Sequence, residues 1–520
     1  MRKLLLDIIC LFATILVIPG CHDDIVPAPV SPDGRINVTG SIRSIRFGGD
    51  AESLTIHVST SGKWHTKVSG AGFTVTPSSG DEGSYDLTIT RTSDETASEK
   101  TAIGHIDIII DGSKTSYGLD VDLLPRSKKT VIAYFFGTSL SYYFSTNIAD
   151  MKQSVATGFL GDNRLLLFNQ KSLTKAVIQE IFFDERTGEV CTYDLEEVAL
   201  DNLTAESFSD NLKSIISYAP AESYSMILLG HSKAWLPKEE DVPETTLSIR
   251  ARPAMNKVPG AEVTRDIGEK SNCLNIDEFS KGLALTGERF DCLYFDVCFM
   301  ASIEAAYALR NNASYIIGSP CEIMGYGSPY HYILEPLFEN DYEAVCYRYW
   351  DFYTNKYSGT KSGCIATIET AKLNAVADVV KRINAQPAAE GFNILSVQSY
   401  EGNSYSGKTG HWFYDVEDYC SSICPDRSLT DALTAALDEC VTNRHHTERF
   451  YSAYNGGMNI INHYCGISIT PDETCIEAID RQLEDETLDS GTRTQLQQQK
   501  EMLNYYNPSL KRTDWYLATH

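Results

Sequence analysis

A cysteine and a histidine, the two residue types that can form a nucleophilic pair, each follow an apolar run of strand length. His231 comes directly after "MILLG", and Cys298 directly after "CLYFDV". If the two runs are parallel strands of one sheet, both side chains project at the same edge. A cysteine beside a histidine can ionise to a thiolate–imidazolium pair, which is an activated nucleophile for acyl transfer. Either residue alone is more often structural, but their matching positions favour catalysis.

Asp296 lies two residues before Cys298, and strand alternation puts both side chains on one side of the chain. A carboxylate there raises the pKa of the thiol unless a cation offsets it. The basic side chain of a substrate could be that cation. Alternatively, Asp296 caps the helix that follows it. We expect this helix to open at Cys298 and to run through Ala306, with its amide end stabilising a thiolate. Glu322 is a second candidate for the wall of a pocket.

The elements that must position these residues are apolar runs of strand length, with helical stretches between them. This order predicts a mostly parallel sheet covered by helices on both faces, with ligands bound at the carboxyl ends of the strands. The predicted strands are residues 131–139, 165–170, 225–231, 290–298, 314–320 and 364–370, and the predicted helices include residues 204–219 and 300–311.

Residues 37–124 have a different pattern, with short alternating or β-rich runs separated by Gly, Ser and Asp turns. This pattern predicts a small all-β sandwich. A Pro- and Asp-containing tether, residues 22–36, precedes it. The segment "LLPRSKKT", residues 123–130, is the predicted linker to a second domain over residues 130–520.

The first 21 residues have the form of an export signal, with Arg2 and Lys3 before an apolar stretch. The segment "VIPGC" followed by "HDD" resembles a bacterial lipoprotein cleavage site, which implies that Cys21 becomes the lipidated first residue. The acidic pair Asp23–Asp24 resembles the export signal of surface lipoproteins in the Bacteroidetes. We therefore expect an outer-membrane lipoprotein, exposed at the cell surface or facing the periplasm.

Composition excludes several classes of function. The net charge is −26, and no patch rich in Lys and Arg stands out, which argues against a nucleic-acid partner. No P-loop or dinucleotide fingerprint is found. The twelve cysteines from Cys191 to Cys475 include no C-x-x-C pair and no zinc spacing, so we interpret those other than Cys298 as scattered thiols.

Three blocks occur in the order "LLGHSKAWLP", "YFDVCFMASIE" and "YIIGSPCEIMGYGSPY". They resemble the His block, the Cys block and the following G-x-G-x-P-Y segment of the clostripain family, over residues 130–520. That resemblance implies a caspase–gingipain fold and a cysteine endopeptidase acting on proteins or peptides. It makes His231 the catalytic histidine, Cys298 the nucleophile and Asp296 part of a pocket for Arg or Lys before the scissile bond.

The resemblance also implies that the N–H groups of Ser232 and Cys298 form the oxyanion hole. Ser232 and Ala234 stand where the family usually has Gly, and a serine cannot adopt Gly-only backbone angles cheaply. The alternative is therefore a catalytically impaired surface protein that binds peptide or glycan. The chemistry needs no cofactor. Some family members depend on calcium, but no EF-hand-type loop locates it here.

Two further expectations follow from resemblances. Trp64 and "TVTPSSG" resemble the BACON domain of Bacteroidetes surface proteins, which was named for glycan binding, although we favour a spacer. Residues 237–275 are polar and lack periodicity, and clostripain relatives cut themselves in this interval after a basic residue. An exposed loop that is never cut is the alternative. The candidate cleavage positions are Arg250, Arg252, Lys257, Arg265 and Lys270.

Overall fold

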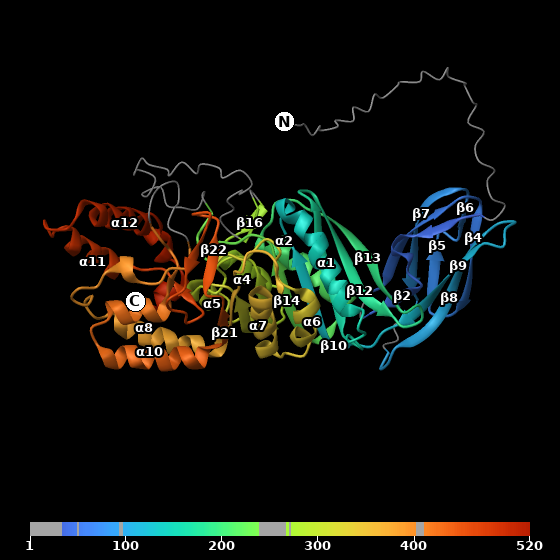
Figure 1. The fold of residues 1–520 in the computed structure, drawn as a ribbon. Helices are drawn as coiled ribbons and strands as arrows, with labels where there is room; N and C mark the ends of the chain where they lie inside the picture. Colours follow the sequence, from blue (N-terminus) through green and yellow to red (C-terminus); the bar gives the residue numbers. More distant parts are fainter. Residues whose placement is uncertain (1–33, 49–50, 93–96, 239–266, 270–271, 402–409) are drawn as a thin grey trace, which may run out of the picture.

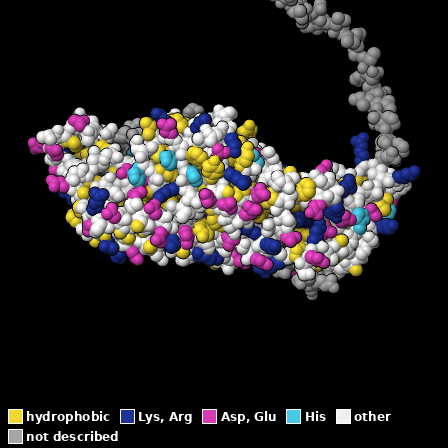
Figure 2. All heavy atoms as spheres, turned by 60° about the horizontal axis from the view of Figure 1, so that its bottom comes forward, with side chains coloured by type: hydrophobic (Ala, Val, Ile, Leu, Met, Phe, Trp, Pro, Cys, Tyr) yellow, Lys and Arg dark blue, Asp and Glu magenta, His cyan; other side chains and the backbone are white. Residues whose placement is uncertain are grey.

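The computed structural model describes residues 34–48, 51–92, 97–238, 267–269, 272–401 and 410–520. A β-sandwich lies at one end of the molecule, and a larger α/β part makes up the rest (Figure 1). No helix within the described ranges is long and apolar enough to cross a membrane. On the face seen in Figure 2, Lys and Arg side chains are interspersed with Asp and Glu.

The sandwich consists of two sheets that enclose a core containing Trp64, which is fully buried. One sheet has the order β1 (Ile36–Val38), β3 (Ser53–Thr60), β7 (Gly83–Arg91) and β5 (Phe73–Thr76). The other has the order β2 (Ser44–Phe47), β9 (Ser116–Leu123), β8 (Thr101–Ile110), β4 (Trp64–Gly70) and β6 (Ser79–Gly80). Alternating burial along β3 explains the period-2 pattern of its sequence.

The linker between the two parts is shorter than the sequence predicted. Strand β9 ends at Leu123, and strand β10 (Ser127–Phe135) already begins three residues after Leu124. Lys129 and Thr130 pair with Ser223 and Tyr224 of strand β14 (Ala221–Leu229). Their polar side chains gave no signal of a strand, which is why the prediction of a linker over residues 123–130 was wrong.

The larger part is built on a nine-stranded sheet with a parallel centre and two antiparallel strands at each end. Its order is β13 (Glu189–Ala199), β12 (Lys175–Asp184), β11 (Arg164–Ser172), β10, β14, β17 (Phe290–Asp296), β18 (Ala313–Gly318), β19 (Cys364–Glu369) and β21 (Val441–His446). The predicted mostly parallel sheet is confirmed. Its central strands read as unbroken apolar runs because both faces are covered.

Helices cover both faces of this sheet (Figure 1). One face packs against α1 (Ser141–Val155), α6 (Tyr330–Phe338) and α7 (Tyr342–Asp351). The other face and its extension pack against α2 (Ala205–Tyr218), α4 (Ile276–Ala284), α5 (Ile303–Ala308), α8 (Leu373–Asn384), α9 (Val416–Ile423), α10 (Arg427–Cys440), α11 (Glu473–Leu483), α12 (Ser490–Leu510) and α13 (Asp514–Thr519).

Three short two-stranded sheets complete the described elements. They pair β15 (Ile267–Glu269) with β16 (Asn272–Leu274), β20 (Tyr414–Asp415) with β24 (Ser468–Ile469), and β22 (Arg449–Ser452) with β23 (Gly457–Ile460). The first of them lies inside the segment 237–275, which the sequence predicted to be a loop throughout. That segment therefore ends in a hairpin.

The order of the sheet determines where a ligand can bind. The chain leaves β10 toward β11 on one side and later returns to β14 on the other side of β10. The carboxyl ends of β10 and β14 therefore flank a topological switch point, where connections diverge and open a crevice.

Candidate active site

His231 and Cys298 lie at the same edge of the sheet, as predicted. Strands β14 and β17 are parallel neighbours, and their register pairs Leu229 with Asp296. Each candidate residue stands two positions beyond its member of that pair, so the two are level at the carboxyl edge. The pairing of the strands thus brings together two blocks that are far apart in the sequence.

A third strand contributes a polar partner that the sequence did not reveal. Ser139 lies just after β10, and its Oγ is 3.1 Å from Nε2 of His231. The hydrogen bond fixes the orientation of the imidazole at the switch point. A serine in the turn "GTSLS" has no distinguishing pattern, and only the order of strands places it there.

Cys298 lies in a confined setting. Its Sγ accepts a hydrogen bond from the backbone N–H of Ile323 at 3.4 Å. Burial, with the Glu322 carboxylate as the next contribution, raises the pKa of the Cys298 thiol to about 12. The thiol is therefore protonated at neutral pH in this structure, and only a change that favours the thiolate would make it a strong nucleophile.

The helix after Cys298 begins later than predicted. Helix α5 starts at Ile303, and the side chain of Ser302 caps it by accepting from Ala305 N at 3.3 Å. Between the strand and the helix, Phe299 adopts a positive φ of 63°, and its N–H donates to the carbonyl of Cys321. Cys298 thus sits in a sharp turn, and the predicted stabilisation of a thiolate by the end of a helix was wrong.

The turn after His231 also departs from expectation. Its left-handed residue is Ala234, with φ of 55°, in the part of this turn that the structure describes. Ser232 instead accepts a hydrogen bond from Ala234 N through its Oγ at 3.0 Å. The strain of this turn therefore falls on Ala234, because a Cβ disfavours left-handed backbone angles.

Asp296 is buried and only partly satisfied. Its side chain is 4% exposed, and Oδ2 accepts from Ser328 N at 2.9 Å and from the Tyr330 hydroxyl at 2.7 Å. Oδ1 has no hydrogen-bond partner among the described residues, and burial raises the pKa of this carboxyl. Because Ser302 is the cap of α5, the alternative role of Asp296 as a helix cap is excluded.

Asn147 of α1 is a second buried group at this place. It is 1% exposed, its Nδ2 donates to the carbonyl of Tyr326 at 3.0 Å, and its Oδ1 has no partner within the described ranges. Asn147 and Asp296 face the same backbone position, Gly327. A Cβ there would lie 2.8 Å from Asp296 Oδ2 and 3.3 Å from Asn147 Nδ2. Only a glycine allows this close approach, because any side chain would clash with both groups. Sequence reasoning missed Asn147 because a single helical asparagine carries no motif.

Glu322 lies beside Cys298 and is held by another segment. Its carboxylate accepts from Ala453 N at 3.0 and 3.2 Å. Burial raises its pKa to about 7. The hairpin formed by β22 and β23 thereby supports the Cys298 turn, and Glu322 acts on the thiol by its charge.

The remaining predictions concern the other cysteines, a metal site, and positions that the structure does not describe. Within the described ranges all twelve cysteines are free thiols, and no cluster of His, Cys, Asp and Glu is arranged to hold a metal ion. Several predicted positions lie outside the described residues: the lipidation residue Cys21 and the candidate cleavage residues Arg250, Arg252, Lys257, Arg265 and Lys270.

A cysteine and a histidine level at the carboxyl edge of a caspase-like sheet are typical of a cysteine hydrolase. Comparison with models of protein families identifies the family, because the model of the clostripain family matches residues 134–469. The chain belongs to the clostripain family, and it is a cysteine-type peptidase. Peptidases of this family need no cofactor for their chemistry.

Solved structures agree with this assignment. A secreted C11 cysteine protease from Bacteroides thetaiotaomicron, iotapain, is 28% identical with a TM-score of 0.61, over 76% of this chain and 99% of that chain. An inactive zymogen of a C11 protease from Parabacteroides distasonis is 22% identical with a TM-score of 0.59, over the same shares of the chains. The second likeness shows the fold alone. No curated protein matches the chain significantly.

Proposed function

We propose that the protein is an endopeptidase that cleaves after Arg or Lys, with Cys298 as the nucleophile and His231 as its acid–base partner. The observation that carries the specificity is Asp296, a buried carboxylate with an orphan oxygen at the end of β17, two residues before the cysteine. Within the described ranges no Lys or Arg forms an ion pair with it.

A buried carboxylate without a cation is unfavourable, because the two hydrogen bonds to Oδ2 repay only part of the cost of desolvation and no Coulomb attraction adds to them. The basic side chain of a substrate supplies both. A guanidinium or an ammonium group has several N–H donors. The two side chains that face Gly327 each have one orphan acceptor, Asp296 Oδ1 and Asn147 Oδ1. The substrate cation thus completes a site that the protein alone leaves unsatisfied.

The peptide bond after that basic residue then lies over Cys298. The thiolate attacks the carbonyl carbon, and the N–H groups of Ser232 and Cys298 stabilise the oxyanion. His231, oriented by Ser139, gives its proton to the leaving amine. Water hydrolyses the acyl-enzyme, with His231 taking a proton from it.

Latency is the second candidate state, and a specific observation favours it. The pKa of the Cys298 thiol is about 12 in the single chain, because the thiol is buried. Cleavage after a basic residue within the segment 237–275 is the proposed activating event. Brief treatment with another protease that cuts this segment should raise activity if the chain is latent, and leave it unchanged if the chain is impaired.

We also propose that Cys21 carries a lipid that anchors the enzyme to the outer membrane, with proteins or peptides as substrates. The sandwich serves as a spacer, and the burial of Trp64 gives no support to glycan binding through that residue. Metabolic labelling with a fatty acid tests the anchor. The label should be present on the parent protein and absent from Cys21→Ser.

Cleavage of a positional peptide library tests the enzymatic proposal. Residues 22–520 should cut after Arg and Lys, and Cys298→Ala should abolish all cutting. Asp296→Asn keeps the size of the side chain and removes its charge, so kcat/KM for basic residues should fall about 100-fold or more. Equal cleavage after uncharged residues by the parent protein would contradict the proposed specificity.

A further inference from the structure

One face of helix α1 lies along the segment of residues 325–331. Tyr143, Asn147 and Asp150 are spaced i, i+4 and i+7 on this face. The Tyr143 ring packs on Gly325, where a Cβ would lie 2.9 Å from the ring Cζ. Asn147 donates to the Tyr326 carbonyl, and Asp150 accepts from the Tyr326 hydroxyl at 2.8 Å.

These contacts lie at different depths. Helix α1 begins at Ser141, at the carboxyl edge of the sheet, and runs back toward the amino edge. Tyr143 is 38% exposed, whereas Asn147, about 6 Å further along the helix axis, is 1% exposed. A side chain that descends from the level of Cys298 to Asp296 therefore passes Tyr143 and Gly325 before it reaches Asn147.

We propose that Tyr143 and Gly325 form the mouth of the site for the basic side chain, and that the Tyr143 ring packs along that side chain. This inference rests on the proposed specificity for Arg and Lys. The methylene stem of a basic residue matches the apolar face of a tyrosine, and the ring face attracts the cation as it enters. The absence of a side chain at Gly325 makes room for the ring itself, and any side chain at this position would displace the ring.

Tyr142 offers a matched control on the same turn. It is 78% exposed, and it lies one residue away from Tyr143, so it points about 100° around the helix. Its ring contacts Tyr143 edge to face, with the centroids 5.5 Å apart. Removing the Tyr142 ring alters the same local surface and takes away a neighbour of Tyr143, but it leaves the Tyr143 ring and Gly325 themselves in place.

The test uses Cys298→Ala protein, which cannot react, and n-butylguanidinium, a mimic of the arginine side chain. Affinity is measured by calorimetry, with uncharged n-butylurea as the ligand control. Tyr143→Ala should weaken binding of butylguanidinium about tenfold. Gly325→Ala should weaken the binding of butylguanidinium as well. Tyr143→Phe keeps the ring and should bind almost as tightly as the parent, and Tyr142→Ala should bind as the parent does. Thermal unfolding of each variant confirms that it is folded.

The outcomes separate this inference from the function on which it rests. The parent here is the Cys298→Ala protein. If its binding of butylguanidinium is lost in Asp296→Asn but unchanged in folded Tyr143→Ala, the role of Tyr143 is overturned and the proposed specificity stays intact. Absence of binding by the Cys298→Ala parent, both uncut and after another protease has cut the segment 237–275, overturns both. Equal weakening by Tyr142→Ala also overturns the inference, because the effect would then belong to the surface of the turn as a whole.

Discussion

Two buried carboxylates oppose ionisation of Cys298. Both Glu322 and Asp296 raise the pKa of its thiol, in addition to the effect of burial. A substrate cation beside Asp296 neutralises one of these charges and so lowers the pKa of the nucleophile. The proposed substrate therefore helps to activate the residue that attacks it.

Replacing Glu322 tests this electrostatic account. Glu322→Gln keeps the acceptor for Ala453 N and removes the charge, so the pKa of the Cys298 thiol should fall. The carboxyl has a pKa of about 7, and the charge is therefore present mainly above neutral pH. Alkylation of Cys298 by iodoacetamide at pH 8–9 should accelerate by about three- to tenfold, equivalent to half to one pKa unit. An unchanged pH–rate profile would contradict the account.

Particular residues show how far the sequence predicts this site. Residues 226–229 and 292–295 are apolar because their strands are covered on both faces, so the ends of these strands and the pair His231–Cys298 could be predicted. Ser139 and Asn147 could not, because their positions depend on strand order and helix packing. The start of α5 was misjudged because the positive φ of Phe299 leaves no trace in an apolar run.

At the scale of elements, two sharp turns at the ends of neighbouring strands hold the candidate residues. One turn contains Ala234 and the other Phe299, both with positive φ. A left-handed backbone conformation costs an L-residue roughly 1–2 kcal/mol, so contacts with the surrounding structure must hold each turn in place. Trp235 Nε1 donates to Thr470 Oγ1 at 3.0 Å, so a residue distant in the sequence holds the first turn in place.

Ala234→Gly should relieve this strain. A glycine adopts a φ of 55° freely, and the gain exceeds its greater entropy in the unfolded chain, so the melting temperature should rise by about 1–2 °C. Ala301→Gly is the matched control, because Ala301 is also buried in the active-site region but has no left-handed backbone. It should lower the melting temperature. A fall in the melting temperature of Ala234→Gly as well would show that the turn is not strained.

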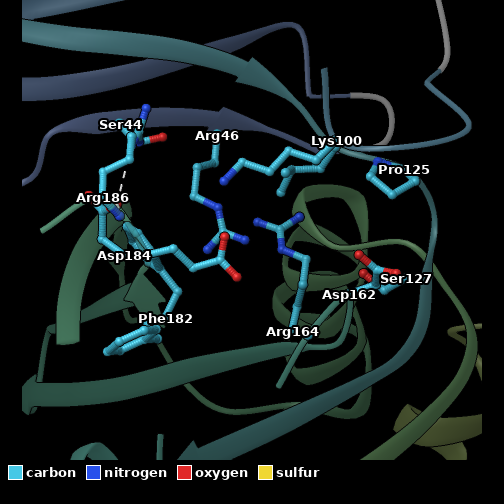
Figure 3. Close-up of a pocket in the computed structure, with 14 residues that line it drawn as sticks. Ser44, Arg46, Lys100, Pro125, Ser127, Asp162, Arg164, Phe182, Asp184 and Arg186 are labelled. Atoms are coloured by element: carbon cyan, nitrogen blue, oxygen red, sulfur yellow. Dashed lines mark hydrogen bonds and ion pairs between the residues drawn. The ribbon is translucent and has the colours of Figure 1, made fainter. Parts of the chain in front are cut away.

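At the scale of the molecule, the sandwich is docked on the antiparallel end of the large sheet. Arg46 of β2 pairs with Glu180 of β12 at 3.1 Å, and Glu180 also binds Arg164 through two hydrogen bonds, at 2.8 and 2.9 Å. Arg186 reaches across to Asp120 and Asp122 of β9. The side chains of Arg46 and Arg164 extend from opposite sides into a cavity of about 300 Å³ at this junction (Figure 3).

A buried ion network at the junction makes the sandwich part of the folding unit. Arg46→Met should destabilise the protein by about 2–3 kcal/mol, because Glu180 is 1% exposed and loses one of its two cations. Lys67→Met, at an exposed position of β4, should change stability by no more than about 0.5 kcal/mol. Chemical denaturation measures both. Equal stability of the two variants would indicate that the sandwich is held by other contacts.

The central claim is that Cys298 attacks a carbonyl that follows a basic side chain. The most direct measurement is mass-spectrometric mapping of the cysteine modified by a peptide electrophile with arginine before the reactive carbonyl, beside the same peptide with uncharged citrulline. Twelve described cysteines are free, so the choice among them is informative. The account predicts one adduct, on Cys298, formed rapidly with the arginine peptide and at least tenfold more slowly with citrulline. Modification of another cysteine, or equal rates with both peptides, would contradict it.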